Sequence, residues 1–359
     1  MKCSSPLLRI PIYSWEKSSI PSTFKVNNSA IVMSYQPDNL EAVRRLLPKP
    51  LNDRLQQIPC GRCMSCRLNT AEDWALRCAL EYKYSDCASF LTLTYNDDFL
   101  EYGNRVNYRE RSVSLEPTLR KKHFQLFNKR LREYSSRVLG IDNIRFFACG
   151  EYGSTTQRPH YHGIYFNLPF FADQFLYKRC DLNGVKYSLY YSPTLEKLWG
   201  KGFCTIGECN WRTISYVSRY TTKKFRSSTE LGLHDLQFRD QILAFFDDSD
   251  LLEDDFLLMS RKPGIGRNFY DLNKDKIYKD DQIITSLPGF GAKVFKPSKY
   301  YDRLFDLTDS DTLDIIKSKR RKLSFNSDRL KRTDLSEAES IALHNQAAKD
   351  KLSAFPRLI

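Results

Sequence analysis

Near the middle of its 359 residues, the chain reads Arg158-Pro159-His160-Tyr161-His162-Gly163-Ile164-Tyr165-Phe166. The sequence predicts a strand from His160 to Asn167. Alternate side chains of a strand share a face, so His160 and His162 would lie on one face, roughly 7 Å apart. Two imidazoles at that distance can hold one metal ion. We expect Tyr161 and Ile164 to point the other way, into a core.

The residues before this strand predict a β-hairpin. The segment 143–153 reads as a strand that runs into a glycine turn, and 154–159 reads as a loop. Glu151 would then lie near the start of the histidine strand. We interpret it as a third metal ligand, a carboxylate oxygen beside two imidazole nitrogens. The alternative is a solvated carboxylate at a turn.

A second motif follows the histidines, and it reads Ser215-Tyr216-Val217-Ser218-Arg219-Tyr220-Thr221-Thr222-Lys223-Lys224. If 210–225 is a helix, capped by Thr213 or Ser215, then Tyr216 and Tyr220 lie on one face at i, i+4. A histidine pair for a metal and a tyrosine pair for nucleophilic attack together indicate cutting and rejoining of nucleic acid. The alternative is that the tyrosines form part of a core stripe.

The charge of the chain favours nucleic acid or an acidic surface as a partner. Lysine and arginine number 56 against 43 acidic residues, which gives a net charge of +13. Aromatic residues make up 13 % of the chain. Aromatic side chains among basic ones can stack on unpaired bases, although most will lie in the core.

Cysteine usage and hydropathy predict a reducing compartment. The chain has ten cysteines, and its first residues lack the apolar core of a secretory signal. No run of about 18 apolar residues predicts a membrane span. We therefore expect thiols or a metal site in the cytoplasm rather than disulfides.

Three of the cysteines form a knuckle pattern, in which Cys60, Cys63 and Cys66 stand at i, i+3 and i+6. This spacing is typical of a zinc site, which needs a fourth ligand. Cys3, Cys78 or Cys87 could supply it. An iron–sulfur run would need a cysteine where Thr70 stands. The alternative is a turn that binds no metal.

The rest of the chain predicts a mixture of helices and strands. We expect a helix that opens at 69–74 with Thr70 and Asp73 as a capping box, and another helix over 118–138. The segments 88–95 and 202–209 predict strands.

Together, the motifs resemble those of rolling-circle replication initiators of the HUH endonuclease superfamily. More narrowly, the chain is similar to the initiators of small single-stranded DNA phages of the gokushovirus group. Matching segments extend over much of the chain, at Pro59-Cys60-Gly61-Arg62-Cys63, Cys66-Arg67-Leu68-Asn69, Leu91–Asp97, Phe146–Gly153, Arg158–His162, Tyr216–Tyr220 with Lys223-Lys224, and Met259–Gly266.

The resemblance implies an α+β fold with a central antiparallel sheet and flanking helices. It implies the histidines on a middle strand. It also implies a Mg²⁺ or Mn²⁺ ion held by His160, His162 and Glu151, which would polarise the scissile phosphate. A structural Zn²⁺ at the cysteine knuckle would be a second ion.

The resemblance further implies the chemistry of the tyrosine helix. Tyr216 or Tyr220 would attack phosphorus to form a 5′-phosphotyrosine bond, helped by Lys223 and Lys224. The released 3′-OH would prime synthesis, and the second tyrosine would serve in rejoining the strand.

The partners implied are single-stranded and replicative-form phage DNA at the origin, with no membrane. No nucleotide-binding G-x-x-x-x-G-K-[ST] motif occurs, so unwinding would need a host helicase, and a host polymerase would extend the primer. The protein would act in the cytoplasm of an infected bacterium.

The same reasoning predicts four regions. Residues 1–68 form an N-terminal segment with the cysteine knuckle, and 69–228 form the nuclease core. Residues 229–310 form an accessory region with an acidic patch and a basic Gly/Pro loop. Residues 311–359 form a basic, helical C-terminal arm.

Three other functions compete with this one. A histidine phosphoesterase would need a third histidine where Ile164 stands. A zinc-knuckle protein that binds DNA without catalysis is a second alternative. A transposase or relaxase of the same superfamily is the third, and the order of the motifs argues against it, because relaxases carry the tyrosine before the histidines.

Overall fold

The structure is a computed structural model, and it falls into two compact units. The first comprises Met1–Thr70 with Phe325–Phe355, and the second Ala71–Ser324 with Pro356–Ile359. We describe residues 3, 7–13, 20, 26–27, 30–34, 45–46, 49–52, 54–107, 110–153, 156–169, 171–182, 185–220, 246–247, 250–330, 335 and 337–353. The boundaries predicted at residues 68, 228 and 310 stay a prediction.

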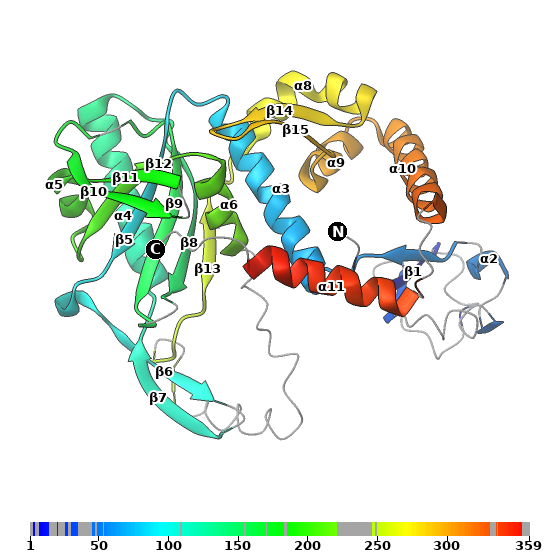
Figure 1. Ribbon diagram of the computed structural model, residues 1–359, viewed down its shortest axis with the longest axis horizontal. Helices are drawn as coiled ribbons and strands as arrows, with labels where there is room; N and C mark the ends of the chain where they lie inside the picture. The colour runs from blue at the N-terminus through cyan, green and yellow to red at the C-terminus, as the bar shows by residue number, and fades with distance from the viewer. Residues whose placement is uncertain are drawn as a thin grey trace. The chain divides into compact units, whose positions relative to one another are not determined.

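A seven-stranded antiparallel sheet dominates the second unit (Figure 1). Its strands, in spatial order, are β10 (Phe175–Leu182), β11 (Val185–Tyr191), β12 (Cys204–Glu208), β5 (Ala88–Thr94), β9 (Pro159–Phe166), β8 (Arg145–Tyr152) and β13 (Phe256–Met259). The histidine strand β9 therefore lies inside the sheet, between β5 and β8. The predicted hairpin of β8 and β9 is confirmed.

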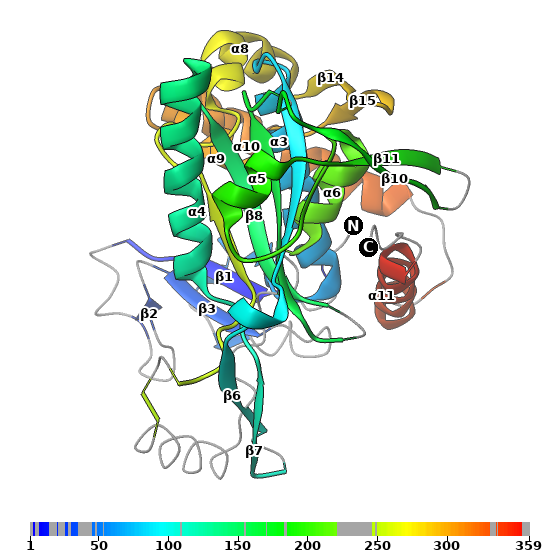
Figure 2. The same cartoon turned by 90° about the vertical axis from the view of Figure 1, so that its left-hand side faces the viewer.

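Helices cover both faces of this sheet, as Figure 2 shows with α4 on one side and α3 and α6 on the other. These helices are α3 (Met64–Tyr82), α4 (Lys121–Tyr134), α5 (Pro193–Trp199) and α6 (Trp211–Arg219). Tyr161 and Tyr165 pack with α4 and α5, whereas Ile164 and Phe166 pack with α3 and α6. An α+β fold with a large antiparallel sheet flanked by helices is thus confirmed.

The position of Ile164 was predicted wrongly. It lies two residues after His162, so strand alternation places it on the histidine face, and it joins the core under α3 and α6. Tyr161 does point to the opposite face, as predicted.

Two helix starts also differ from the prediction. Helix α3 begins at Met64 rather than near Asn69, and the Thr70 hydroxyl donates within the helix to the Cys66 carbonyl. Helix α6 is capped by Asn210, whose side chain accepts the backbone N–H of Thr213 while Thr213 accepts that of Asn210. An asparagine satisfies these N-terminal donors as well as the serine or threonine that we expected.

The segment between β9 and β12 holds the β10–β11 hairpin and α5, where the sequence suggested only an irregular insertion. Further along, a second hairpin joins β6 (Tyr102–Asn107) and β7 (Ser112–Pro117), and a third joins β14 (Ile283–Leu287) and β15 (Gly291–Phe295). The remaining helices of this unit are α8 (Arg267–Asp280), α9 (Lys299–Asp306) and α10 (Ser310–Leu330), of which α10 continues past Ser324 into the first unit.

Ion pairs fix part of the basic C-terminal region. Arg320 on α10 pairs with Asp281 and Asp302, and Leu313 and Ile316 of the same helix are buried. The predicted basic Gly/Pro loop is held in a similar way, because Glu81 accepts the backbone N–H of Gly266.

The first unit has a small sheet in the order β2-β3-β1-β4, formed by β1 (Leu7–Pro11), β2 (Val26–Asn27), β3 (Ala30–Ser34) and β4 (Gln56–Ile58). Helices α2 (Lys49–Asn52) and α11 (Glu337–Ser353) belong to it too. Its described hydrophobic core has four buried residues, Ile10, Ile12, Ile31 and Leu51.

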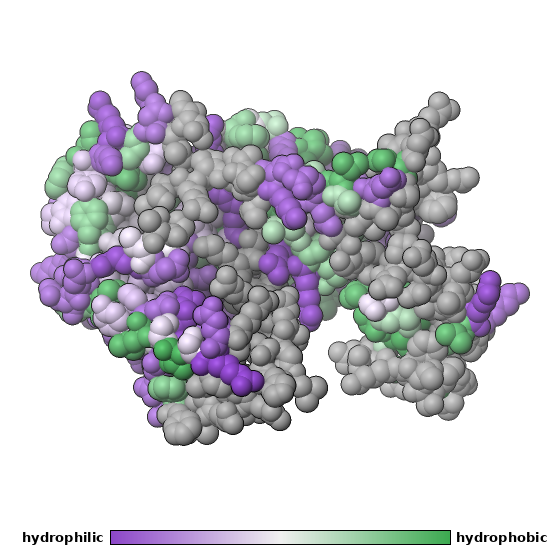
Figure 3. All heavy atoms as spheres, turned by 60° about the horizontal axis from the view of Figure 1, so that its bottom comes forward, coloured by the Kyte–Doolittle hydropathy of each residue, from purple (hydrophilic) through white to green (hydrophobic). Residues whose placement is uncertain are grey.

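The described surface is mixed in character. On the face drawn in Figure 3, hydrophobic side chains form small patches among hydrophilic ones, which is usual for a protein surface. Among the described residues, no helix combines the length and the apolar character needed to cross a membrane.

Candidate active site

Pairing of β8 with β9 builds a cluster of three side chains, which we call the histidine cluster: Glu151, His160 and His162. Glu151 lies directly opposite His160 in the register. The Nε2 atom of each histidine lies 3.1 Å from Glu151 Oε1. One ligand atom from each of the three residues lies within 4.8 Å of the others. The three residues singled out in the sequence therefore come together.

Neighbouring groups orient both imidazoles. His160 Nδ1 lies 3.0 Å from the carbonyl oxygen of Arg158, which can only accept a hydrogen bond. His162 Nδ1 lies 3.0 Å from the hydroxyl of Thr92 on β5, and the Phe90 ring stacks on the His162 ring at 5.5 Å. With a proton on Nδ1, each Nε2 presents its lone pair to the centre of the cluster, the arrangement that metal-binding histidines use.

The cluster lies almost entirely inside the protein. Glu151 is 2 % exposed and His162 is fully buried, while His160 is half-buried. Burial alone would raise the pKa of the Glu151 carboxyl, but hydrogen bonds to His160 and His162 outweigh it and hold that pKa well below its usual range. Glu151 is thus an anion at neutral pH, as a metal ligand must be.

Helix α6 brings both tyrosines to the same place. The Tyr216 hydroxyl donates to Glu151 Oε1 at 3.3 Å, and its ring centroid lies 5.3 Å from that of His162. The Tyr220 ring stacks against His162 at 6.3 Å, and the two tyrosine rings lie 5.1 Å apart. The i, i+4 spacing on the sheet-facing side of α6 accounts for this convergence.

The phenols are neutral in this environment. Burial, followed by the negative charge of Glu151, raises the pKa of both Tyr216 and Tyr220. The guanidinium of Arg219 lies over the Tyr216 ring at 5.5 Å, and burial lowers the pKa of this arginine. Loss of a phenolic proton here would therefore need a positive charge close to the oxygen.

Two contacts in the site were not anticipated from the sequence. Thr92 and Phe90 reach His162 because β5 pairs with β9 in the register Thr92↔His162. Only that long-range register could have revealed them. Lys223 and Lys224, predicted to assist the tyrosines, lie outside the described residues.

The cysteines form a second group, the cysteine cluster, consisting of Cys3, Cys60, Cys63 and Cys66. Of the three candidates for the fourth position, Cys3 is the one brought to the knuckle. Cys78 is buried in the core under α3, and Cys87 is half-buried just before β5. All ten cysteines lie in the described part of the chain, and none forms a disulfide.

The histidine cluster has the composition of a metal site with open positions. Two imidazole nitrogens and one carboxylate oxygen suit a divalent ion such as Mn²⁺, and Mg²⁺ less well because it prefers oxygen ligands. Three protein ligands leave positions for water or substrate, which catalytic sites keep and structural sites lack. The residues present thus fit a catalytic divalent ion.

Comparison with known proteins places the chain. A family model for the replication-associated protein ORF2 matches residues 88–225, which include the histidine cluster and both tyrosines. The replication-associated protein ORF2 of Spiroplasma virus 4 is 36 % identical over 270 residues, 74 % of each chain. Replication-associated protein VP4 of Bdellovibrio phage phiMH2K is 35 % identical over 169 residues, covering 46 % of this chain and 48 % of that protein.

A third relative, the replication-associated protein ORF4 of Chlamydia phage 1, is 32 % identical over 171 residues, covering 47 % of this chain and 38 % of that protein. No solved structure matches the chain. These relatives share one printed role, and the similarity to the first of them extends over most of both chains. The chain belongs to the replication initiator proteins of microviruses.

Proposed function

We propose that this initiator nicks single-stranded DNA at the phage origin by tyrosine transesterification and later rejoins the strand. The observation that carries the proposal is the convergence of Tyr216 and Tyr220 on the histidine cluster. A nucleophile needs to lie beside the group that activates the phosphate, and here two nucleophiles do so from one helix.

We assign the HUH type of nuclease fold to the second unit on the same grounds. Its histidines share one face of an inner strand, both neighbouring strands are antiparallel, and the tyrosine helix packs on that face. The order of the motifs, with histidines before tyrosines, supports an initiator of the rolling-circle kind.

Glu151, His160 and His162 would hold one Mn²⁺ or Mg²⁺ ion. Such an ion supplies a Lewis acid that draws charge from the scissile phosphate. The chain's own contribution is to fix the donor atoms in place. The Arg158 carbonyl and Thr92 hold the imidazoles, and burial excludes water from most of the site.

The covalent step balances within the DNA and one tyrosine. The phenolic oxygen forms a bond to phosphorus and loses its proton, and the bond from phosphorus to the 3′-oxygen breaks. The leaving oxygen takes up a proton and becomes a free 3′-OH, while the 5′-phosphate stays on the tyrosine. The reverse of this step rejoins a strand.

The pair of tyrosines suits a cycle with two cuts. While one tyrosine carries the 5′-phosphate, the other lies one helical turn away and still faces His162. It can cut the regenerated origin, after which the 3′-OH attacks the first phosphotyrosine and closes a circle. Lys223 and Lys224 remain proposed helpers of this chemistry.

The partners follow from the reaction. A net charge of +13 suits single-stranded and replicative-form DNA. A host helicase would unwind the duplex and a host polymerase would extend the 3′-OH, in the cytoplasm of the infected bacterium. The competing proposal is a protein that binds DNA through the cysteine cluster without cutting it, which the gathering of four thiols favours.

One experiment separates the two. The full chain is incubated with single-stranded origin DNA and Mn²⁺, and the products are separated under denaturing conditions. We expect a protein–DNA adduct with the wild type and with Tyr177→Phe, an exposed tyrosine on β10. The double variant Tyr216→Phe/Tyr220→Phe should give none. Tight binding without any adduct in the wild type would instead support the competing proposal.

A further inference from the structure

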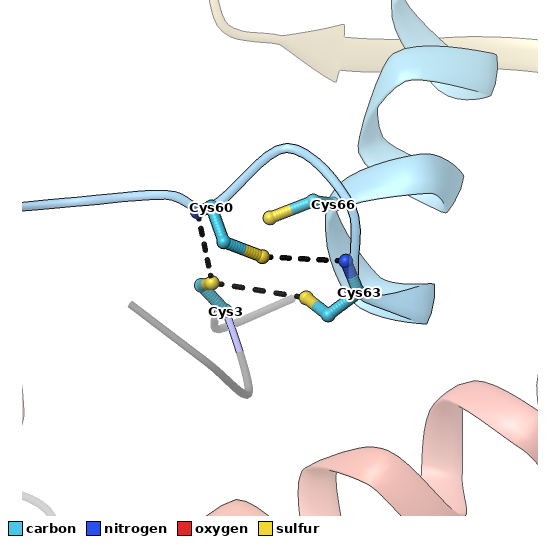
Figure 4. A group of neighbouring side chains, drawn as sticks. All are labelled: Cys3, Cys60, Cys63 and Cys66. Atoms are coloured by element: carbon cyan, nitrogen blue, oxygen red, sulfur yellow. Dashed lines mark hydrogen bonds between the residues drawn. The ribbon is translucent and has the colours of Figure 1, made fainter. Parts of the chain in front are cut away.

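The four thiols of the cysteine cluster lie at the separation that a single ion requires. Their sulfur atoms are all within 4.8 Å of one another, and the Sγ atoms of Cys3 and Cys63 are 3.7 Å apart. A tetrahedral zinc site with Zn–S bonds of about 2.3 Å places its sulfurs about 3.8 Å apart. A disulfide would need about 2.05 Å. Figure 4 shows the four sulfurs gathered around one point.

Strand pairing explains how a residue so distant in sequence reaches this point. Strands β1 and β4 are antiparallel, with Leu7 opposite Ile58. Cys3 precedes β1 and Cys60 follows β4, so both lie at the same end of the pair. The backbone N–H of Cys60 donates to Cys3 Sγ at 3.2 Å, across 57 residues of chain.

The turn from Cys60 to Cys63 is shaped to present sulfur. Gly61 has a φ of +76°, and the backbone N–H groups of Arg62 and Cys63 donate to Cys60 Sγ at 3.4 and 3.3 Å. Amide donors of this kind stabilise the thiolate form of a cysteine. This is a property that a thiol packed in a turn does not need.

Helix α3 supplies the last ligand and further positive potential. Cys66 lies in its first turn, and Cys63 directly precedes the helix. The N-terminal end of a helix carries partial positive charge, which favours thiolates. Cys66 is buried whereas the other three cysteines are half-buried, so the cluster lies partly inside the first unit.

We propose that Cys3, Cys60, Cys63 and Cys66 hold one Zn²⁺ in a closed, structural site. Four thiolates complete a tetrahedral shell and leave no position for substrate, in contrast to the histidine cluster. Binding releases the protons of the four thiols to solvent and changes no oxidation state. An iron–sulfur cluster spreads its ligands over several irons, which sulfurs this close together do not allow.

The first unit has a reason to use such a site. Its described core holds only four buried side chains, and small cores of this kind are usually reinforced by a metal or by disulfides. The ion would tie the segment before β1, the turn after β4 and the start of α3 into one knot. We therefore expect metal loss to loosen residues 1–70 first.

The test measures zinc in the full-length protein, purified under reducing conditions and dialysed free of loosely bound metal. We expect one zinc per chain by elemental analysis and native mass spectrometry. Cobalt should substitute for it and give the absorption of a tetrahedral tetrathiolate. Cys180→Ser, on β10 and half-buried, is the matched control and should keep the zinc. Cys3→Ser and Cys66→Ser should hold less than a tenth of it.

Further variants keep the test decisive. Cys3→His should retain zinc, because three cysteines and one histidine also form structural sites. His160→Ala should keep one zinc per chain, so a failed proposal here is distinguishable from a failed nuclease proposal. A reduced wild-type protein without zinc, or with iron in its place, would overturn the inference. So would one zinc that survives in both Cys3→Ser and Cys66→Ser.

Discussion

The two side-chain clusters of this protein differ in donors, in openness and in what holds them. The histidine cluster has three ligands, two nitrogens and one oxygen, on the inner strands of a large sheet. The cysteine cluster has four sulfurs, on a turn, a helix start and the segment before a short strand. An incomplete ligand shell on a rigid sheet suits catalysis, and a complete shell on a small unit suits stability.

The difference also concerns what surrounds each cluster. Two tyrosines, Thr92 and Phe90 pack directly against the histidine cluster. Around the cysteines, the described contacts come mainly from backbone N–H groups. The first setting supplies nucleophiles, whereas the second supplies only stabilisation of thiolates. Four predictions test this division, from the largest expected effect to the smallest.

Chelation should separate the clusters completely. Brief EDTA treatment should remove the exchangeable ion of the histidine cluster and abolish adduct formation, and added Mn²⁺ should restore it. Zinc should remain bound throughout, because a closed thiolate shell offers no position for an incoming chelator. Measuring adduct and zinc in the same samples checks both. Loss of zinc together with activity, neither restored by Mn²⁺, would contradict the division.

His160→Ala should lower the rate of adduct formation about 10³-fold or more. Loss of a ligand to a catalytic ion removes several kcal/mol of transition-state stabilisation, and about 4 kcal/mol corresponds to that factor. His160 is half-buried, so this truncation should leave the fold intact. His344→Ala, half-buried on α11, is the matched control and should react like the wild type. A His160→Ala rate within a few-fold of the wild type would argue against a metal at this cluster.

Much of this division could be predicted from sequence, and the reasons are local. Strand alternation places His160 and His162 on one face, the glycine turn predicts the hairpin that brings Glu151 to them, and helical spacing pairs the tyrosines. The predicted apolar stripe of Phe124, Phe127 and Leu131 is likewise buried in the observed helix α4.

What could not be predicted depends on register between distant segments. The fourth cysteine was left open among three, because the β1–β4 pairing that selects Cys3 has no local signal. Thr92 was missed for the same reason, since only the β5–β9 register places it at His162. The early start of α3 at Met64 went unnoticed because the knuckle was interpreted as a separate turn.

Thr92→Val should have a medium effect. It removes the hydroxyl 3.0 Å from His162 Nδ1 and preserves the shape of the side chain. Loss of such an orienting contact typically costs about 10–100-fold in metal affinity or activity. We expect a higher Mn²⁺ requirement, with activity partly recovered at high Mn²⁺. Thr205→Val is the control, because Thr205 lies opposite Thr92 on β12. An unchanged Mn²⁺ titration would show that Thr92 does not orient the ligand.

Gly61→Ala should have the smallest effect, confined to the cysteine cluster. A Cβ there meets no atom within 4 Å, so the cost comes only from the left-handed φ of +76°. That cost is about 1 kcal/mol, or roughly fivefold weaker zinc binding in a chelator competition. Gly140→Ala meets the same open space at φ +69° and should leave zinc affinity unchanged. Equal zinc affinities for the two variants would speak against a knuckle that depends on this turn.

The most direct test of the nuclease proposal is to identify the residue that carries the DNA. The covalent adduct formed with single-stranded origin DNA and Mn²⁺ is digested with protease and nuclease, and its peptides are sequenced by mass spectrometry. We predict a 5′-phosphonucleotide on Tyr216 or Tyr220, and on the remaining tyrosine when either one is changed to phenylalanine. Modification of any other residue, or no covalent product despite DNA binding, would contradict the proposed role of this site.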